Sequence, residues 1–173
     1  MIELRKIKRE NIPSALELAK QYRLLNEPDE AESICLDILE VDPDHQDTLI
    51  TLLLALTDKF SSSGLSPSFE KAKAIVDRLP VPYCKSYYRG ILYERRAKNY
   101  LKQEEPGGGA AAYQWFAKAM KSYDEAIKTC DPSNQDAVLR WNSCARIINS
   151  NPEVRSEEKS APEMLLDAYD EPH

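Results

Sequence analysis

The chain of 173 residues has few of the side chains that catalytic and metal sites use. It holds only two histidines, and its four cysteines form no Cys-x-x-Cys pair and lie near neither histidine in the sequence. Zinc sites and redox motifs require closer spacing of these ligands. We therefore expect no metal and no cofactor, and thiols that stay reduced in the cytoplasm and pack as small apolar groups. The cysteines are Cys35, Cys84, Cys130 and Cys144.

Candidates for catalysis are equally few. His45 follows Asp42-Pro43-Asp44 in a predicted turn, and His173 is the last residue. The glycine run 107–109 has no strand before it and no Lys-Ser/Thr after it, so it does not match a phosphate-binding loop and is predicted to be a flexible turn. No nucleophile is paired with a base in the sequence. We expect no catalytic residue and no enzyme.

Long apolar runs and a strong basic charge are also absent. No stretch of eighteen apolar residues occurs, and the N-terminus lacks the pattern of a secretory signal, so neither a membrane span nor secretion is expected. The net charge is −6, and from Glu153 onward seven acids and two bases account for −5 of it. A nearly neutral body with an acidic tail does not suit a nucleic-acid-binding protein.

Helical spacing is present along most of the chain, whereas strand patterns are rare. Apolar residues at steps of three and four predict a first helix from Pro13 to about Leu25 and a second from about Asp29 to Val41. Further helices are predicted after Pro82 to about Gln103, over 110–129, and up to Ser150. The segments 61–67 and 104–109 are predicted loops.

The apolar positions repeat at an interval of 34 residues, which indicates a repeat architecture. One set of apolar positions in the first helix has a matching set 34 residues later. The first set is Ala15, Leu18, Ala19 and Tyr22, and the second is Leu49, Leu52, Leu53 and Leu56.

These positions resemble the tetratricopeptide pattern W-x2-L-G-x2-Y, A-x3-F and P. Gly90 with Tyr93, Ala119-x3-Tyr123 and Trp141-x2-Cys144-Ala145 match the same pattern further along. The resemblance covers residues 12–150. It implies an all-α fold, a right-handed α-solenoid of antiparallel helical hairpins, with three repeats and one final helix. We expect a basic arm over 1–11, the helical domain over 12–152, and an acidic tail over 153–173 that contains a short capping helix.

The resemblance also implies a function, because first helices of this family line a concave groove that binds peptides. We expect a scaffold or adaptor that holds a protein segment, acidic segments included, in a groove with an apolar floor and a few cations. The asparagine pair of the chaperone-binding subtype is missing, since Lys20 and Leu54 occupy those positions. The expected groove residues are Lys20, Arg23, Leu54, Tyr87, Arg95, Asn142 and Arg146.

Two alternatives remain open. The chain can be a structural module that forms homo-oligomers, with its acidic tail in a groove. The tail places Met164, Leu165, Ala168 and Tyr169 on one helical face, which suits either a cap on the last helix or a groove-binding peptide. The bases of 5–9 are flanked by acids and have no aromatic residue among them, which favours an arm over a nucleic-acid patch.

Overall fold

The computed structural model describes residues 2–61, 65–103 and 106–156, and within these ranges the chain is all-α. The expected fold class is confirmed to that extent. No helix in the described ranges is long and apolar enough to cross a bilayer. The elements are η1 (Arg9–Asn11), α1 (Ile12–Leu24), α2 (Pro28–Val41), α3 (Gln46–Asp58), η2 (Lys59–Ser61), α4 (Leu65–Arg78), α5 (Pro82–Gln103), α6 (Gly108–Thr129) and α7 (Asp136–Ser150).

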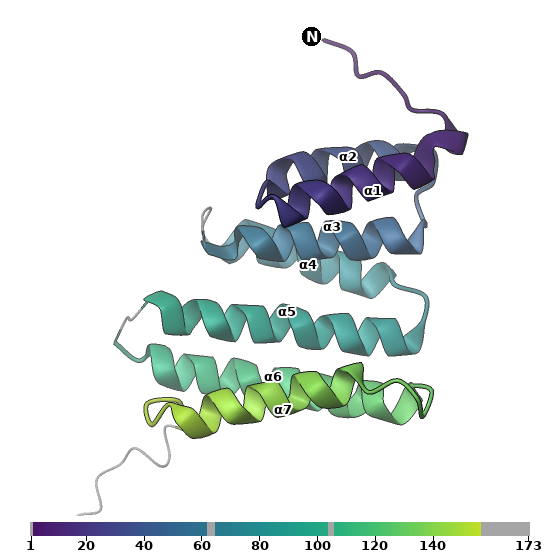
Figure 1. Cartoon of the computed structure of the whole chain (residues 1–173). Coiled ribbons are helices and arrows are strands. Elements are labelled where there is room, and N and C mark those ends of the chain that lie inside the picture. Colours follow the sequence, from purple (N-terminus) through teal and green to yellow (C-terminus); the bar gives the residue numbers. More distant parts are fainter. Residues whose placement is uncertain (1, 62–64, 104–105, 157–173) are drawn as a thin grey trace, which may run out of the picture.

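The helices are stacked in sequence order (Figure 1). Each helix packs against the next along the chain, and α3 also contacts α1 and α5. In the view of Figure 1, α1, α3, α5 and α7 lie in front, and α2, α4 and α6 lie behind them. The most extensive contact joins α5 and α6, each of which is 22 residues long. The molecule therefore has one side formed by α1, α3, α5 and α7 and another formed by α2, α4 and α6.

The turn between α1 and α2 shows how the sequence fixes these helix ends. Asn26 adopts the left-handed region with φ 61°. The N–H of Glu27 donates to the carbonyl of Tyr22 at 2.9 Å, and the N–H of Asn26 donates to that of Arg23 at 3.1 Å. These two bonds form a Schellman motif, which satisfies the last carbonyls of α1. Pro28 then begins α2, where its missing N–H is no loss.

The positions that carry the repeat pattern are the places where helices approach closely. Ala19 and Leu53 are fully buried, as are Ala31 and Ala119 in the second helices. Small side chains here let neighbouring helices pack backbone to backbone, and the larger apolar residues fill the space around them. Ala145 is only half-buried, because no further described helix packs on α7.

A close approach joins α5 and α6 at Gly90. A Cβ atom added to Gly90 lies only 2.4 Å from Cε1 of Tyr123, so the ring fills the space that a larger residue would need. The Tyr123 hydroxyl donates to Oε2 of Glu94 at 2.6 Å, and Glu94 is itself 1% exposed. Burial, and then the Glu94 carboxylate, raise the pKa of Tyr123, which keeps this donor protonated. Lys98 and Arg140 also donate to Glu94, which ties in α7.

Two predicted loops differ from the structure. The first, expected over 61–67, is shorter, because α4 begins at Leu65 and Pro67 falls in its first turn, where proline is tolerated. The second ends earlier than expected, because α6 begins at Gly108. Gly108 and Gly109 thus belong to the first turn of α6, whereas Gly107 precedes the helix with φ 81°. A Cβ atom on Gly109 would lie 2.3 Å from the carbonyl oxygen of Glu153.

Both flanking segments contact the helices. In the arm over 1–11, Ile7 packs on the Ile12–Leu16–Ile38 cluster. Arg9 pairs with Asp42 at 3.3 Å, which places basic charge beside the acidic end of α2. After α7 the chain turns back and buries Val154, which is 2% exposed. The predicted capping helix and its apolar face lie in 157–173, outside the described residues.

Gly90→Ala is expected to lower the free energy of unfolding by about 3 kcal/mol. Overpacking costs about 1–3 kcal/mol, and displacing the Tyr123 ring leaves a buried donor unpaired at about 1–3 kcal/mol. The higher helix propensity of alanine offsets about 1 kcal/mol of this. Urea unfolding followed by circular dichroism measures the change. In a Tyr123→Leu background the same substitution is expected to cost less than about 1 kcal/mol, since the ring is gone; an equal cost in both backgrounds contradicts the clash.

Stability is expected to fall above pH 9 because of two buried thiols. Burial raises the pKa of Cys35 and of Cys144 from 9.0 to about 12. Between these values the unfolded chain loses the thiol protons and the folded chain keeps them, so alkali favours unfolding. Each thiol contributes a loss of about 1.4 kcal/mol at pH 10 relative to pH 7. Urea titrations across this range test it, and the Cys35→Ala/Cys144→Ala variant is expected to have a shallower slope.

Candidate functional site

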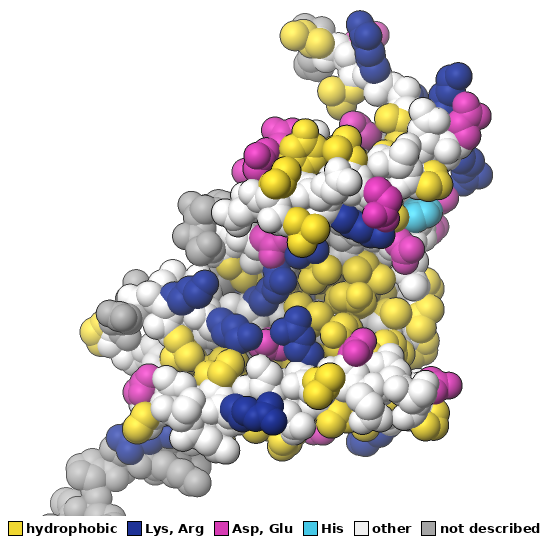
Figure 2. Space-filling model, viewed as in Figure 1, with side chains coloured by type: hydrophobic (Ala, Val, Ile, Leu, Met, Phe, Trp, Pro, Cys, Tyr) yellow, Lys and Arg dark blue, Asp and Glu magenta, His cyan; other side chains and the backbone are white. Residues whose placement is uncertain are grey.

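The candidate site is the face formed by α1, α3, α5 and α7, which Figure 2 shows from the same direction as Figure 1. Hydrophobic side chains gather over α3 and the N-terminal half of α5, and dark-blue cations lie beside them toward the C-terminal half of α5. The sequence of α5 explains this division. Its first half contains Tyr83, Tyr87 and Tyr88, and its second half contains Arg95, Lys98 and Lys102.

The apolar half centres on Leu54 and Tyr87, two of the expected groove residues. Leu54 is partly buried and packs against both large hydrophobic clusters, so it lies where the units of α3 and α5 meet. The ring of Tyr87 stacks on Tyr83 with centroids 5.6 Å apart and meets Tyr88 edge-on at 5.2 Å. Burial raises the pKa of Tyr88 to about 12, so its phenol is neutral at pH 7. These contacts hold a rigid, partly exposed apolar surface.

The cationic half is organised by Asp58 at the end of α3. Arg23 of α1 donates from Nε to Oδ2 of Asp58 at 2.9 Å, and Arg95 of α5 donates to Oδ1. Arg95 also donates to the Thr57 hydroxyl at 2.6 Å. One carboxylate therefore joins α1, α3 and α5. Both guanidinium groups were expected to offer charge to a partner, but both are bound to Asp58. The net charge of the two arginines and the aspartate together is +1.

A cavity of about 300 Å³ lies beside this bridge. Lys98 and Lys102 line it, together with Asn99, whose side chain is buried on α5. Lys98 donates to the buried Glu94, whereas Lys102 is exposed and has no ion pair within the described residues. A hollow with several cations and one paired carboxylate is suited to an acidic group of a ligand. The full lining is Asn26, Thr57, Asp58, Phe60, Arg95, Lys98, Asn99 and Lys102.

The other expected groove residues are less closely joined to this centre. Lys20 is exposed on α1 and pairs with Glu17 at 2.7 Å, and this hydrogen bond raises the pKa of Lys20. Asn142 is half-buried on α7, and Arg146 is exposed one turn later, without an ion pair in the described part of the chain. Arg23 and Arg95 thus share Asp58, and Arg95 also donates to the Leu54 carbonyl at 3.3 Å. Leu54 and Tyr87 pack against the same hydrophobic cluster.

Sequence reasoning missed three residues of this surface: Asp58, Lys98 and Lys102. A signal for the two lysines existed, because they follow Arg95 at steps of three and four and so share one helical face. No comparable signal marked Asp58. Its partners lie 35 and 37 residues away in the sequence, and only the packing of three helices brings them together.

Of the two histidines, His45 has a structural role, and His173 lies outside the described residues. His45 caps α3, where its Nδ1 accepts from the backbone N–H of Thr48 at 3.3 Å. Within the described ranges no group of three or more His, Cys, Asp or Glu side chains is arranged to hold a metal ion.

The comparisons with known proteins give no match: no family model, no curated protein and no solved structure is significantly similar to this chain.

Asp58→Asn is expected to lower the free energy of unfolding by about 1–2 kcal/mol. The substitution leaves two half-buried arginines facing each other without the shared anion, although screening at this exposure limits the loss. The decrease is expected to shrink at high salt. Asp44→Asn is a matched control, because the Asp44 side chain is 95% exposed and its ion pair with Arg78 is long, at 3.9 Å. This substitution is expected to change the free energy of unfolding by less than about 0.5 kcal/mol. Equal effects of the two substitutions in urea unfolding contradict the bridging role.

Proposed function

We propose that the chain is a tetratricopeptide-type α-solenoid with a right-handed twist, and that it works as a non-enzymatic adaptor that holds a protein segment. Support for the repeat comes from the buried small residues Ala19, Ala31 and Ala119, from the close approach at Gly90, and from the stacking of consecutive helices. In such a stack each unit buries its apolar face on the next, and the end units stay partly uncovered.

The observation that carries the binding proposal is the division of the first-helix face into an apolar half and a cationic half. The apolar half offers Leu54 and the ring of Tyr87, and the cationic half offers Lys102, with Arg146 on α7. A peptide with one or two large apolar side chains and a nearby carboxylate matches both halves. The four cysteines are free thiols, which supports a location in the reducing cytoplasm for this function.

Selection from a random peptide display library tests this proposal, because the method requires no partner to be chosen in advance. The full chain is expected to enrich peptides that carry an acidic residue next to aromatic or aliphatic residues. Affinity of an enriched peptide is then measured by fluorescence polarisation. The Lys102→Glu/Arg146→Glu variant is expected to weaken binding about tenfold or more, because both cations become repulsive while neither supports the fold through an ion pair in the described residues.

Lys128→Glu is the matched control, since Lys128 is exposed on α6, away from the first-helix face. It changes the net charge in the same direction and is expected to leave the affinity within about twofold. Equal weakening by the control variant indicates a general charge effect. Enrichment of peptides without acidic or apolar preference argues against the groove.

A second candidate, self-association, is favoured by one feature of the last helix. A cavity of about 520 Å³ lies between α6 and α7, with Met120, Trp141 and Ile148 among its lining residues. In a second copy of the chain the same apolar strip would pair with this one. Sedimentation velocity over a range of concentrations decides between the candidates, and Ile148→Lys is expected to keep the chain monomeric. A monomer at every concentration rules out self-association.

The proposed placement of the acidic tail in a groove concerns residues outside the described part.

A further inference from the structure

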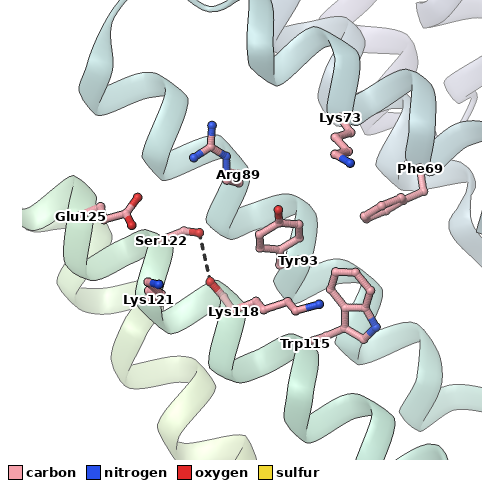
Figure 3. A pocket seen from close by; sticks show the side chains of 9 residues that line it. All are labelled: Phe69, Lys73, Arg89, Tyr93, Trp115, Lys118, Lys121, Ser122 and Glu125. Carbon is pink, nitrogen blue, oxygen red and sulfur yellow. Dashed lines mark hydrogen bonds between the residues drawn. The ribbon is translucent and has the colours of Figure 1, made fainter.

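A second hollow lies on the other side of the molecule, between α4 and α6 and over α5 (Figure 3). Its volume is about 390 Å³, within the range of small-molecule sites. α4 and α6 lie behind α3 and α5 in Figure 1, so this hollow is separate from the proposed peptide groove. Its lining consists of Phe69 and Lys73 from α4, Arg89 and Tyr93 from α5, and Trp115, Lys118, Lys121, Ser122 and Glu125 from α6.

Three aromatic rings form one wall of the hollow. Phe69, Tyr93 and Trp115 contact one another, with centroids 6.5 Å apart for Phe69–Tyr93, 5.5 Å for Phe69–Trp115 and 5.4 Å for Tyr93–Trp115. Each ring comes from a different helix. The wall is therefore fixed by the packing of α4, α5 and α6, and it excludes water from one side of the hollow, which strengthens electrostatic interactions there.

Four cations surround the opening. Lys73, Lys118 and Lys121 form no ion pair within the described residues, and Arg89 lies 3.7 Å from Asp77 on α4. Figure 3 shows Lys73 and Arg89 on opposite sides of the space, with Lys118 reaching along α6 toward Trp115. Among the lining residues only Glu125 is acidic. This concentration of positive charge stands out in a chain whose net charge is −6.

A fifth cation lies behind the aromatic wall. The guanidinium carbon of Arg96 is 4.0 Å from the ring centroid of Phe69 and 4.1 Å from that of Trp115. The Lys118 ammonium is 4.2 Å from the centroid of Trp115. These cation–π contacts hold Trp115 between two positive groups. The ring is thus not available as a stacking platform for a base or a sugar, and the hollow offers a ligand mainly positive charge.

We propose that this hollow binds a small ligand with two or more linked phosphate groups, such as a diphosphate or triphosphate moiety. Glu125 offsets one of the four positive charges in this space of about 390 Å³, and Asp77, 3.7 Å from Arg89, offsets part of another, so two to three negative charges neutralise the rest. Carboxylates carry one charge each, so a peptide would need two or three acidic side chains in this space. A phosphate monoester carries about −1.5 to −2 at pH 7, so two or three linked phosphates supply the charge in a compact group. Lysine ammonium groups suit this role, because they bind phosphate oxygens as flexible point charges.

The site is independent of the proposed peptide groove, because none of its lining residues belongs to the cavity beside Asp58. The helix α5 separates the two, with Arg89 and Tyr93 on one side and Tyr87 and Arg95 on the other. Failure of peptide binding therefore leaves this proposal untouched, and the reverse also holds.

Trp115 provides a direct reporter for the test. The chain has two tryptophans, so Trp141→Phe leaves Trp115 as the only one. Titration of this full-length variant with tripolyphosphate is expected to change the Trp115 emission to saturation, because neutralising Lys118 removes a cation from the ring. Citrate, a tricarboxylate, and a phosphoserine peptide are expected to bind at least about tenfold more weakly. Calorimetry on the unmodified chain checks that the phenylalanine has not altered the affinity.

The variants locate the site. Lys73→Gln/Lys121→Gln removes two cations from two helices and is expected to weaken tripolyphosphate binding at least about tenfold. Lys8→Gln/Lys128→Gln removes the same charge from exposed positions outside both hollows and is expected to change it less than about twofold. No saturable binding overturns the proposal. Equal weakening in both double variants also overturns it, as does equal or tighter binding of citrate or the phosphoserine peptide.

Discussion

The contact between α5 and α6 at Gly90 is the constraint on which the rest of the structure depends. Because Gly90 has no side chain, the Tyr123 ring packs against α5 at this position, and its hydroxyl donates to the buried Glu94. Glu94 in turn accepts from Lys98 and from Arg140 of α7. A buried carboxylate with three donors is stable only when all of them are in place, because an uncompensated charge in the interior is costly. The geometry of three helices is therefore coupled to one glycine.

This coupling determines how the surfaces of α5 are presented. The helix is 22 residues long and contacts α4, α6 and η2, so both of its accessible sides are fixed by neighbours. One side carries Tyr87 and Arg95 into the first-helix face, and the other carries Arg89 and Tyr93 into the hollow beside α6. Sites on packed helices keep their geometry better than sites on loops, because rotamers are restricted by the surrounding side chains. Two preformed surfaces thus share one rigid wall.

Much of the fold could be predicted from the sequence, because it depends on local signals. Pro28, Pro82 and the left-handed Asn26 mark helix ends through backbone chemistry, and periodic apolar residues identify the buried faces. The misjudged boundaries have local causes too. Pro67 suggests a loop, although proline is also tolerated in a first helical turn. The glycine run suggests a flexible turn. The contact of Gly109 with the backbone of Glu153 could not be predicted, because the two residues are far apart in the sequence. The helical period predicts which side chains of one helix lie on the same face. It does not predict which charged residues of other helices meet that face.

The distribution of charge connects the stack with its two surfaces. Arg23, Arg95, Lys98 and Arg140 are half-buried and bound to Asp58 or Glu94, so these cations act mainly to join helices. Lys73, Lys102, Lys118 and Lys121 form no ion pair within the described residues, and each lines one of the two hollows. Cations without a neighbouring anion repel one another when they are clustered, which opposes folding unless a ligand compensates the charge. The hollows also contain paired cations, such as Arg89 and Lys98, but these four lysines place uncompensated positive charge where a negatively charged ligand can reach it.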